Sequence, residues 1–212
     1  TPAFFANWAT NTANQARVTM NQTLIVALGR SFDDSNNTVP ITSPALDAKH
    51  ASEPACYACH KTLDPMRQVF RQAYTLTGHE QKDAAQTTLP GVFAFDGVTR
   101  NIGNPRELGQ ALASHPRFAV AWTQKLCYWA NSAPCLESDP EFLRVAQVFE
   151  KSGFSWPRLV RELLSSPLVT GARNTQTFAE QGLTISVTRR DQLCVAMSSR
   201  LGLPNVCAVG RA

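Results

Sequence analysis

The sequence predicts a mainly α-helical protein with one short β-hairpin. Apolar residues recur at helical spacing over most of the chain, and several of these stretches open with a capping residue followed by proline. Strand-like alternation around an Asp-Gly turn occurs near residue 96. With 212 residues, of which 43% are hydrophobic and 17% charged, the chain has the composition of an ordinary globular protein.

The first helix is expected within residues 11–30, with Gly29 as its C-cap. Its apolar positions at helical spacing are Val18, Leu24, Ile25 and Leu28. A second helix is expected to begin with Asp64 as N-cap and Pro65 in the first helical position, and to run to about Thr75. This pattern gives Asp64 a structural role.

The hairpin is expected between His79 and Asn104, with its turn at Asp96-Gly97. Helices return after it, because Asn104 and Ser155 suit N-caps and Asp139-Pro140 repeats the pattern of a cap followed by proline. The expected helices span residues 105–114, 116–129, 139–151, 155–165 and about 184–201.

Charge and hydropathy argue against two classes of partner. The net charge of +4 and the isoelectric point near 8.8 are mildly basic, and the basic residues are scattered, which does not suggest nucleic acid. The longest apolar run, Leu24 to Leu28, is far shorter than the roughly 20 residues of a membrane-spanning helix. The beginning at Thr1-Pro2 is interpreted as that of a processed protein or of a fragment of a longer one.

The most specific signal is the pentapeptide Cys56-Tyr57-Ala58-Cys59-His60, because Cys-x-x-Cys-His is the attachment motif of a c-type haem. Two thiols three residues apart lie on one helical turn, where each can add to a haem vinyl group. The adjacent His60 then supplies the proximal axial ligand of the iron. The motif predicts one covalent haem c bound through Cys56 and Cys59.

Three other interpretations of the motif are weaker. A thioredoxin-like dithiol would follow a strand in a βαβ unit, but residues 43–50 have no strand character. A zinc site would need a second Cys or His pair at matching spacing, and the sequence contains none. Chance occurrence is the third.

Haem attachment of this kind takes place outside the bacterial cytoplasm, and four further cysteines fit an oxidising compartment. We therefore expect a periplasmic, cell-surface or secreted protein. Two local disulfides are predicted, Cys127 with Cys135 and Cys194 with Cys207, because each pair joins a helical pattern to the chain that returns after a turn. The alternative is four buried thiols.

The stretch from His50 to Pro65 resembles the haem-bearing module of large bacterial proteins associated with planctomycete-type cytochrome c domains. The shared pattern is a histidine, a Pro-Ala-Cys spacer, the haem motif and a Leu/Met-Asp-Pro. Residues 106–170 resemble the helical domain that follows this module, so that the resemblance covers about two-thirds of the chain. Where the family pattern continues with Gly-Phe-x-x-Glu-Asn-Phe-Asp, this chain has Arg67-Gln68-Val69-Phe70-Arg71-Gln72-Ala73-Tyr74.

The predicted fold is thus a cytochrome c-like haem-binding segment followed by a small helical domain. The expected division is residues 1–80 for haem binding, 81–104 for a linker with the hairpin, 105–172 for the helical domain, and 173–212 for a C-terminal helix with a disulfide.

The ligand opposite His60 is the open question of the site. His50 is placed first, because six extended residues before Cys56 reach about 20 Å and because its position coincides with the histidine of the resembling pattern. The other interpretation of His50 is a helix-end or propionate-bonding residue. His79 and Met197 are the alternates, whereas His115 is interpreted as a helix-entry residue.

The expected function is a monohaem cytochrome that carries electrons to and from redox partner proteins, and that can belong to a larger complex. One alternative is a haem enzyme of the peroxidase or oxygenase type, with an open sixth position. Another is a structural subunit of a larger assembly that the covalent haem stabilises. No catalytic residues are assigned.

Overall fold

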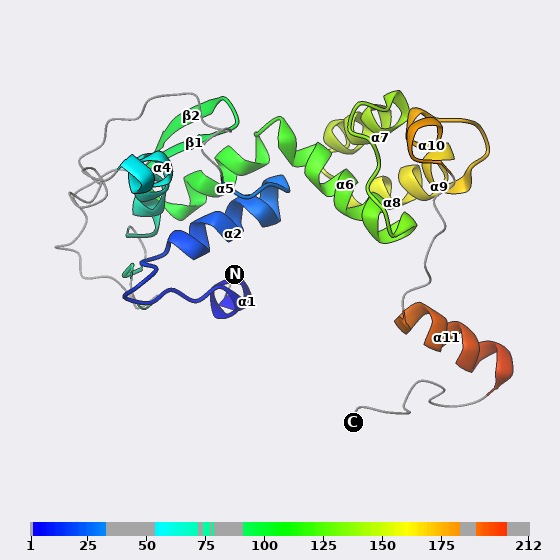
Figure 1. Ribbon diagram of the computed structural model, residues 1–212, viewed down its shortest axis with the longest axis horizontal. Coiled ribbons are helices and arrows are strands. Elements are labelled where there is room, and N and C mark those ends of the chain that lie inside the picture. The colour runs from blue at the N-terminus through cyan, green and yellow to red at the C-terminus, as the bar shows by residue number, and fades with distance from the viewer. Residues whose placement is uncertain are drawn as a thin grey trace. The chain divides into compact units, whose positions relative to one another are not determined.

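The computed structural model divides the chain into two compact units, residues Thr1–Trp122 and Thr123–Ala212, which we describe separately (Figure 1). The structure describes residues 2–32, 54–71, 74–76, 78, 91–182 and 190–202. The architecture is mainly helical with one antiparallel hairpin, as the sequence predicts. Within the described residues, none of the helices combines the length and the apolar character that a membrane crossing requires.

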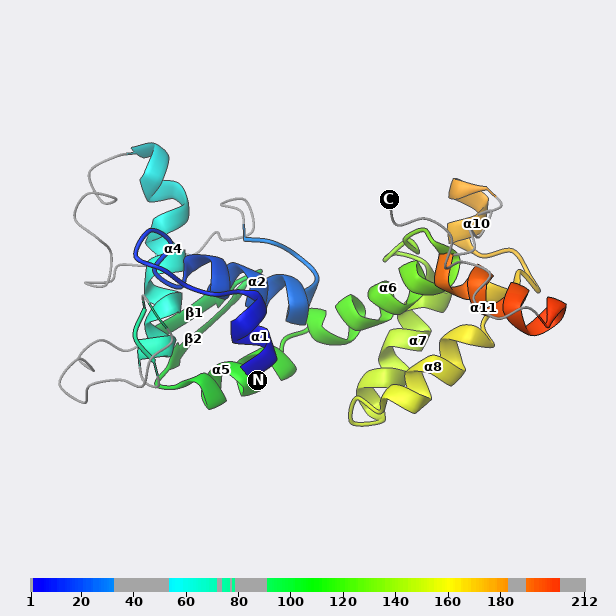
Figure 2. The ribbon, with the colours of Figure 1, turned by 90° about the horizontal axis from the view of Figure 1, so that it is seen from below.

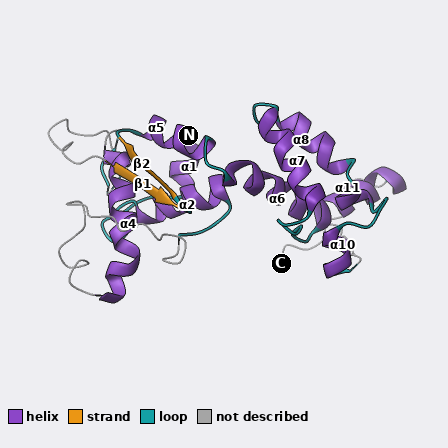
Figure 3. Cartoon of the chain, turned by 90° about the horizontal axis from the view of Figure 1, so that it is seen from above, coloured by secondary structure: helices purple, strands orange, loops and turns teal. Residues whose placement is uncertain are grey.

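The first unit contains a two-stranded sheet and the helices around it (Figures 2 and 3). The helices are α1 (Pro2–Asn7), α2 (Arg17–Leu28), α4 (Pro54–Arg71), α5 (Pro105–Ala113) and the beginning of α6 (Arg117–Asn131). Strand β1 (Gly91–Phe95) pairs antiparallel with β2 (Val98–Ile102), with Phe93 opposite Arg100. The turn residues Asp96 and Gly97 both have positive φ, 46° and 80°, which suits a tight hairpin turn and confirms the predicted turn.

The core of the first unit lies where β1 packs on α4 and where α2 and α5 close the remaining sides. Its largest fully buried side chains include Met20, Leu24, Leu28, Phe93 and Phe95. Burial of large apolar side chains of this kind is the dominant favourable contribution to folding. Helix α4, which carries Cys56 to His60, is therefore anchored through its carboxyl-terminal half.

Helix α2 is shorter than the predicted helix of residues 11–30. It begins at Arg17 because Gln15 and Ala16 have φ values of 47° and 64°, a left-handed conformation that no α-helix continues. Side-chain hydrogen bonds hold the preceding turn: the Asn11 and Asn14 side-chain oxygens accept from backbone N–H groups, and the Thr10 hydroxyl donates to Asn14 Oδ1. At the other end, Gly29 has φ 74° and its N–H donates to Ile25 O, which confirms the predicted cap.

The prediction that a helix begins at Asp64 is wrong. Helix α4 is continuous from Pro54 to Arg71 and contains Pro65 in its interior. Proline has no N–H, so the carbonyl four residues earlier receives no helical hydrogen bond from it. The Asp64 side chain is fully buried and contacts other side chains instead of capping a helix.

The second unit contains the rest of α6 and five further described helices. These are α7 (Pro140–Lys151), α8 (Trp156–Leu164), α9 (Pro167–Thr170), α10 (Gln176–Gln181) and α11 (Arg190–Leu201). Helices α7, α8 and α9 pack on one another. Asp139 caps α7 as predicted, by accepting from Glu141 N at 2.9 Å, whereas Ser155 precedes α8 without a side-chain capping bond. The short helices α9 and α10 were not predicted.

The predicted disulfide between Cys127 and Cys135 is present and buried, with the two Cα atoms 6.0 Å apart. Gln124 holds the returning chain, because its amide donates to Cys135 O at 2.6 Å and accepts from Cys135 N at 3.0 Å. Cys194 lies on α11, and its predicted partner Cys207 lies outside the described residues, so that second bridge stays a prediction.

Candidate haem-attachment site

The three residues of the haem motif lie on one helix face. Cys56, Cys59 and His60 occupy positions i, i+3 and i+4 near the start of α4, where the helical period places them side by side. All three side chains are partly buried, and neither cysteine belongs to a disulfide. Tyr57 is 41% exposed, and the Lys61 ammonium lies 5.8 Å from its ring centroid.

This donor set suits a c-type haem. Cys56 and Cys59 would hold the porphyrin through two thioether bonds, and the imidazole of His60 would supply a nitrogen ligand to the iron. The burial of α4 changes along its length: Cys56, Tyr57, Cys59 and His60 retain exposed surface, whereas Asp64 to Phe70 are buried. The exposed surface lies at the end of the helix where a cofactor would be attached.

A buried carboxylate contacts the histidine of the motif. Asp64 Oδ1 lies 3.3 Å from His60 Nδ1, one helical turn away, and Asp64 is 0% exposed. The same carboxylate is held by Arg17 through two contacts, Nε to Oδ1 at 2.6 Å and Nη2 to Oδ2 at 3.2 Å. Arg67 Nε lies 3.2 Å from Asp64 Oδ1. One anion thus faces two guanidinium groups and one imidazole.

Burial by itself would raise the pKa of Asp64. The hydrogen bond from Arg17 and the charges of Arg67 and Arg17 outweigh that cost and hold the pKa below its ordinary value of 3.8. Asp64 is therefore ionised at neutral pH. Arg67 is fixed in turn, since one of its terminal nitrogens donates to both the backbone and the side-chain oxygen of Gln15 at 2.9 Å.

The three candidates for the sixth iron ligand lie outside the described part of the first unit. His50 and His79 lie outside the described residues, and Met197 lies on α11 in the second unit, 38% exposed. His115 is buried before α6, where its Nε2 donates to Phe95 O at 3.2 Å and its Nδ1 accepts from Arg117 N at 3.1 Å. Burial lowers the pKa of His115 below 6.5, and its interpretation as a helix-entry residue is confirmed.

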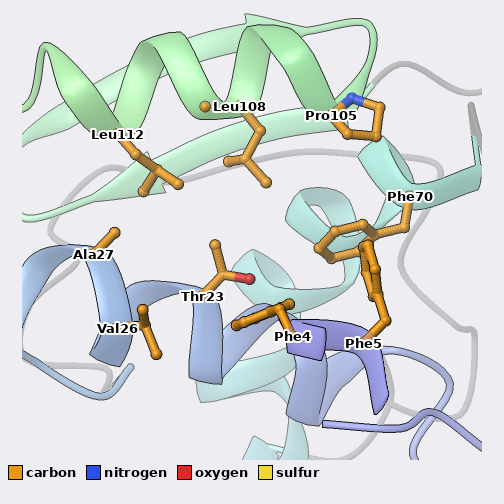
Figure 4. A pocket seen from close by; sticks show the side chains of 10 residues that line it. Phe4, Phe5, Thr23, Val26, Ala27, Phe70, Pro105, Leu108 and Leu112 are labelled. Carbon is orange, nitrogen blue, oxygen red and sulfur yellow. The ribbon is translucent and has the colours of Figure 1, made fainter. Parts of the chain in front are cut away.

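A largely apolar pocket of about 360 Å³ lies elsewhere in the first unit (Figure 4). It is lined by Phe4 and Phe5 of α1, Thr23, Val26 and Ala27 of α2, Phe70 of α4, and Pro105, Leu108, Gly109 and Leu112 of α5. Phe70 follows His60 by ten residues, which is about 15 Å along a helix. The pocket is therefore not the site of the motif.

Sequence reasoning missed the partners of the motif, namely Arg17, Arg67 and the buried position of Asp64. Arg17 is 47 residues from Asp64, and no local pattern connects the two. Arg67 could have been found from its i, i+3 spacing to Asp64, had the helix been predicted as continuous.

No group of three or more His, Cys, Asp and Glu side chains suited to a metal ion occurs in the described part of the chain. Comparisons of the chain with protein families, with curated proteins and with solved structures found no match.

Proposed function

We propose that the protein is a monohaem c-type cytochrome that carries electrons outside the cytoplasm. The observation that carries the proposal is the placement of Cys56, Cys59 and His60 on one partly exposed face of α4, with neither cysteine in a disulfide. The haem supplies the redox centre. Cys56 and Cys59 would hold it covalently through their sulfurs, and His60 would supply one nitrogen ligand to the iron.

The compartment and the partners belong to the same proposal. The disulfide between Cys127 and Cys135 supports an oxidising location, such as the periplasm, the cell surface or the exterior, because structural disulfides persist there. Redox proteins are the proposed partners. His50 remains the proposed second ligand, and His79 and Met197 remain its alternates.

The test is expression of the full chain in a bacterial periplasm with the haem-attachment machinery. We expect haem that stays with the polypeptide in a denaturing gel and a pyridine haemochrome spectrum of two thioether bonds. The double variant Cys56→Ser/Cys59→Ser should lose the haem. The matched control Cys127→Ser/Cys135→Ser removes the other described cysteine pair and should retain it. A wild-type protein that carries stoichiometric zinc, or no covalent haem, would overturn the proposal.

Carbon monoxide distinguishes electron transfer from haem catalysis. A six-coordinate carrier should bind carbon monoxide slowly or not at all after reduction, whereas an open distal site binds it at once. Spectra of His50→Ala in the oxidised and reduced states then test the second ligand. Unchanged spectra would exclude His50.

A further inference from the structure

We infer that Asp64 is a positioning residue that fixes the tautomer of His60 and increases its donor strength toward the haem iron, and that Arg17 and Arg67 limit this effect. The inference rests on the proposed haem attachment. The inference extends the proposed function by assigning control of the redox potential to a partly buried group of side chains. We call it the Asp64 cluster: Asp64, Arg17, Arg67 and Gln15.

The first step is the identity of the protonated ring nitrogen. Asp64 Oδ1 lies 3.3 Å from His60 Nδ1, and an ionised carboxylate can only accept hydrogen bonds. Nδ1 therefore carries the proton in the neutral ring, and Nε2 presents its lone pair. Metal-bound histidines commonly donate their second N–H to a carboxylate or carbonyl in this way. The contact with Asp64 thus favours the tautomer in which Nε2 is unprotonated and able to bind the iron.

The second step is that the carboxylate cannot turn away. Arg17 contacts both of its oxygens, and Arg67 approaches the same oxygen as His60. Arg67 is itself held by two hydrogen bonds to Gln15. Because Asp64 is 0% exposed, bulk solvent does not reach its carboxylate. The orientation of the imidazole is therefore set by the fold of residues 15–17 against α4.

The third step concerns the iron. A hydrogen bond from Nδ1 to an anion raises the basicity of the ligand, which stabilises the ferric state and lowers the midpoint potential. The two guanidinium groups draw charge away from the carboxylate and weaken the hydrogen bond it accepts from His60. Loss of Asp64 and loss of Arg17 should consequently move the potential in opposite directions.

The test compares Asp64→Asn, Arg17→Gln and the control Asp96→Asn in the haem-loaded full chain. Asp96 is a suitable control because it also lies between two arginines, Arg30 and Arg117, each 3.7 Å away, but it does not contact the motif. We expect Asp64→Asn to raise the midpoint potential and to change the g values of the ferric EPR spectrum. Arg17→Gln should lower the potential, and Asp96→Asn should leave both readouts at the wild-type values.

Haem staining of every variant distinguishes failure of the proposed haem attachment from failure of the role assigned to Asp64. Absence of covalent haem in the wild type refutes the proposed function. Covalent haem in Asp64→Asn, with a potential and EPR spectrum matching Asp96→Asn, refutes the role of Asp64. If Asp64→Asn fails to fold, Arg17→Gln decides by itself, since an unchanged or raised potential in that variant contradicts the inference.

Discussion

The substitution Gly91→Ala tests the packing that anchors the motif helix. Gly91 begins β1, and a methyl group there would lie 2.9 Å from Val69 N, 3.1 Å from Ile102 O and 3.2 Å from Val69 Cβ. The first of these distances is about 0.5 Å inside the 3.4 Å limit of ordinary contacts, and backbone atoms cannot turn aside as a side-chain end would. The β1–β2 hairpin and α4 would have to move apart to accommodate the methyl group.

Overpacking of a core costs about 1–3 kcal/mol. Replacing glycine by alanine returns about 0.4–1 kcal/mol by restricting the unfolded chain. With the middle of each range, about 2 kcal/mol lost and about 0.7 kcal/mol gained, the net loss expected for Gly91→Ala is about 1.3 kcal/mol in the free energy of unfolding. It is measurable by urea titration followed by far-ultraviolet circular dichroism.

The matched control is Gly109→Ala on α5. No atom lies within 4 Å of a methyl group at that position, so the gain in helix propensity of about 0.5–1 kcal/mol should appear without a packing cost. The two variants should shift the urea midpoint in opposite directions. A Gly91→Ala protein as stable as the wild type would refute the close approach of β1 to α4.

Two further predictions concern the second unit. Asp139→Asn should cost about 1–3 kcal/mol at pH 7, because the buried carboxylate accepts from Thr177 N, Thr177 Oγ1 and Glu141 N. Burial raises the pKa of Asp139, but these hydrogen bonds outweigh that effect and hold the pKa below 3.8. The stabilisation by the carboxylate is therefore present above that pH and is lost as the pH falls through the folded-state pKa. A difference in urea midpoint between Asp139→Asn and the wild type that grew on acidification would contradict this. Cys127→Ala/Cys135→Ala should lower the free energy of unfolding by about 2–3 kcal/mol, as expected for a disulfide with a sequence separation of 8, and equal urea midpoints would show that the bridge contributes nothing.

Local signals in the sequence predicted local structure well. The Asp96-Gly97 turn, the Gly29 cap and the caps at Asn104 and Asp139 are all confirmed, because each depends on residues within one turn of each other. The disulfide between Cys127 and Cys135 is also confirmed, and its two cysteines are only eight residues apart in the sequence.

The same reasoning failed at Asp64 because a distant residue decides its role. Asp64-Pro65 has the same order of residues as Asp139-Pro140, but the helix already begins at Pro54 and the carboxylate is bound by Arg17. Such a contact leaves no periodic trace in the sequence. The motif itself could be read directly, whereas the cluster that surrounds His60 Nδ1 required the fold.

The contact between Arg17 and Asp64 makes the environment of His60 depend on whether α2 has docked on α4. The contact joins residues 47 positions apart, and the entropic cost of closing that loop is offset only when α2 docks on α4. A nascent chain or an excised peptide that contains Cys56 to His60 would therefore lack the contact that orients the His60 imidazole. Under the proposed haem attachment, the midpoint potential would therefore differ between such a peptide and the folded first unit.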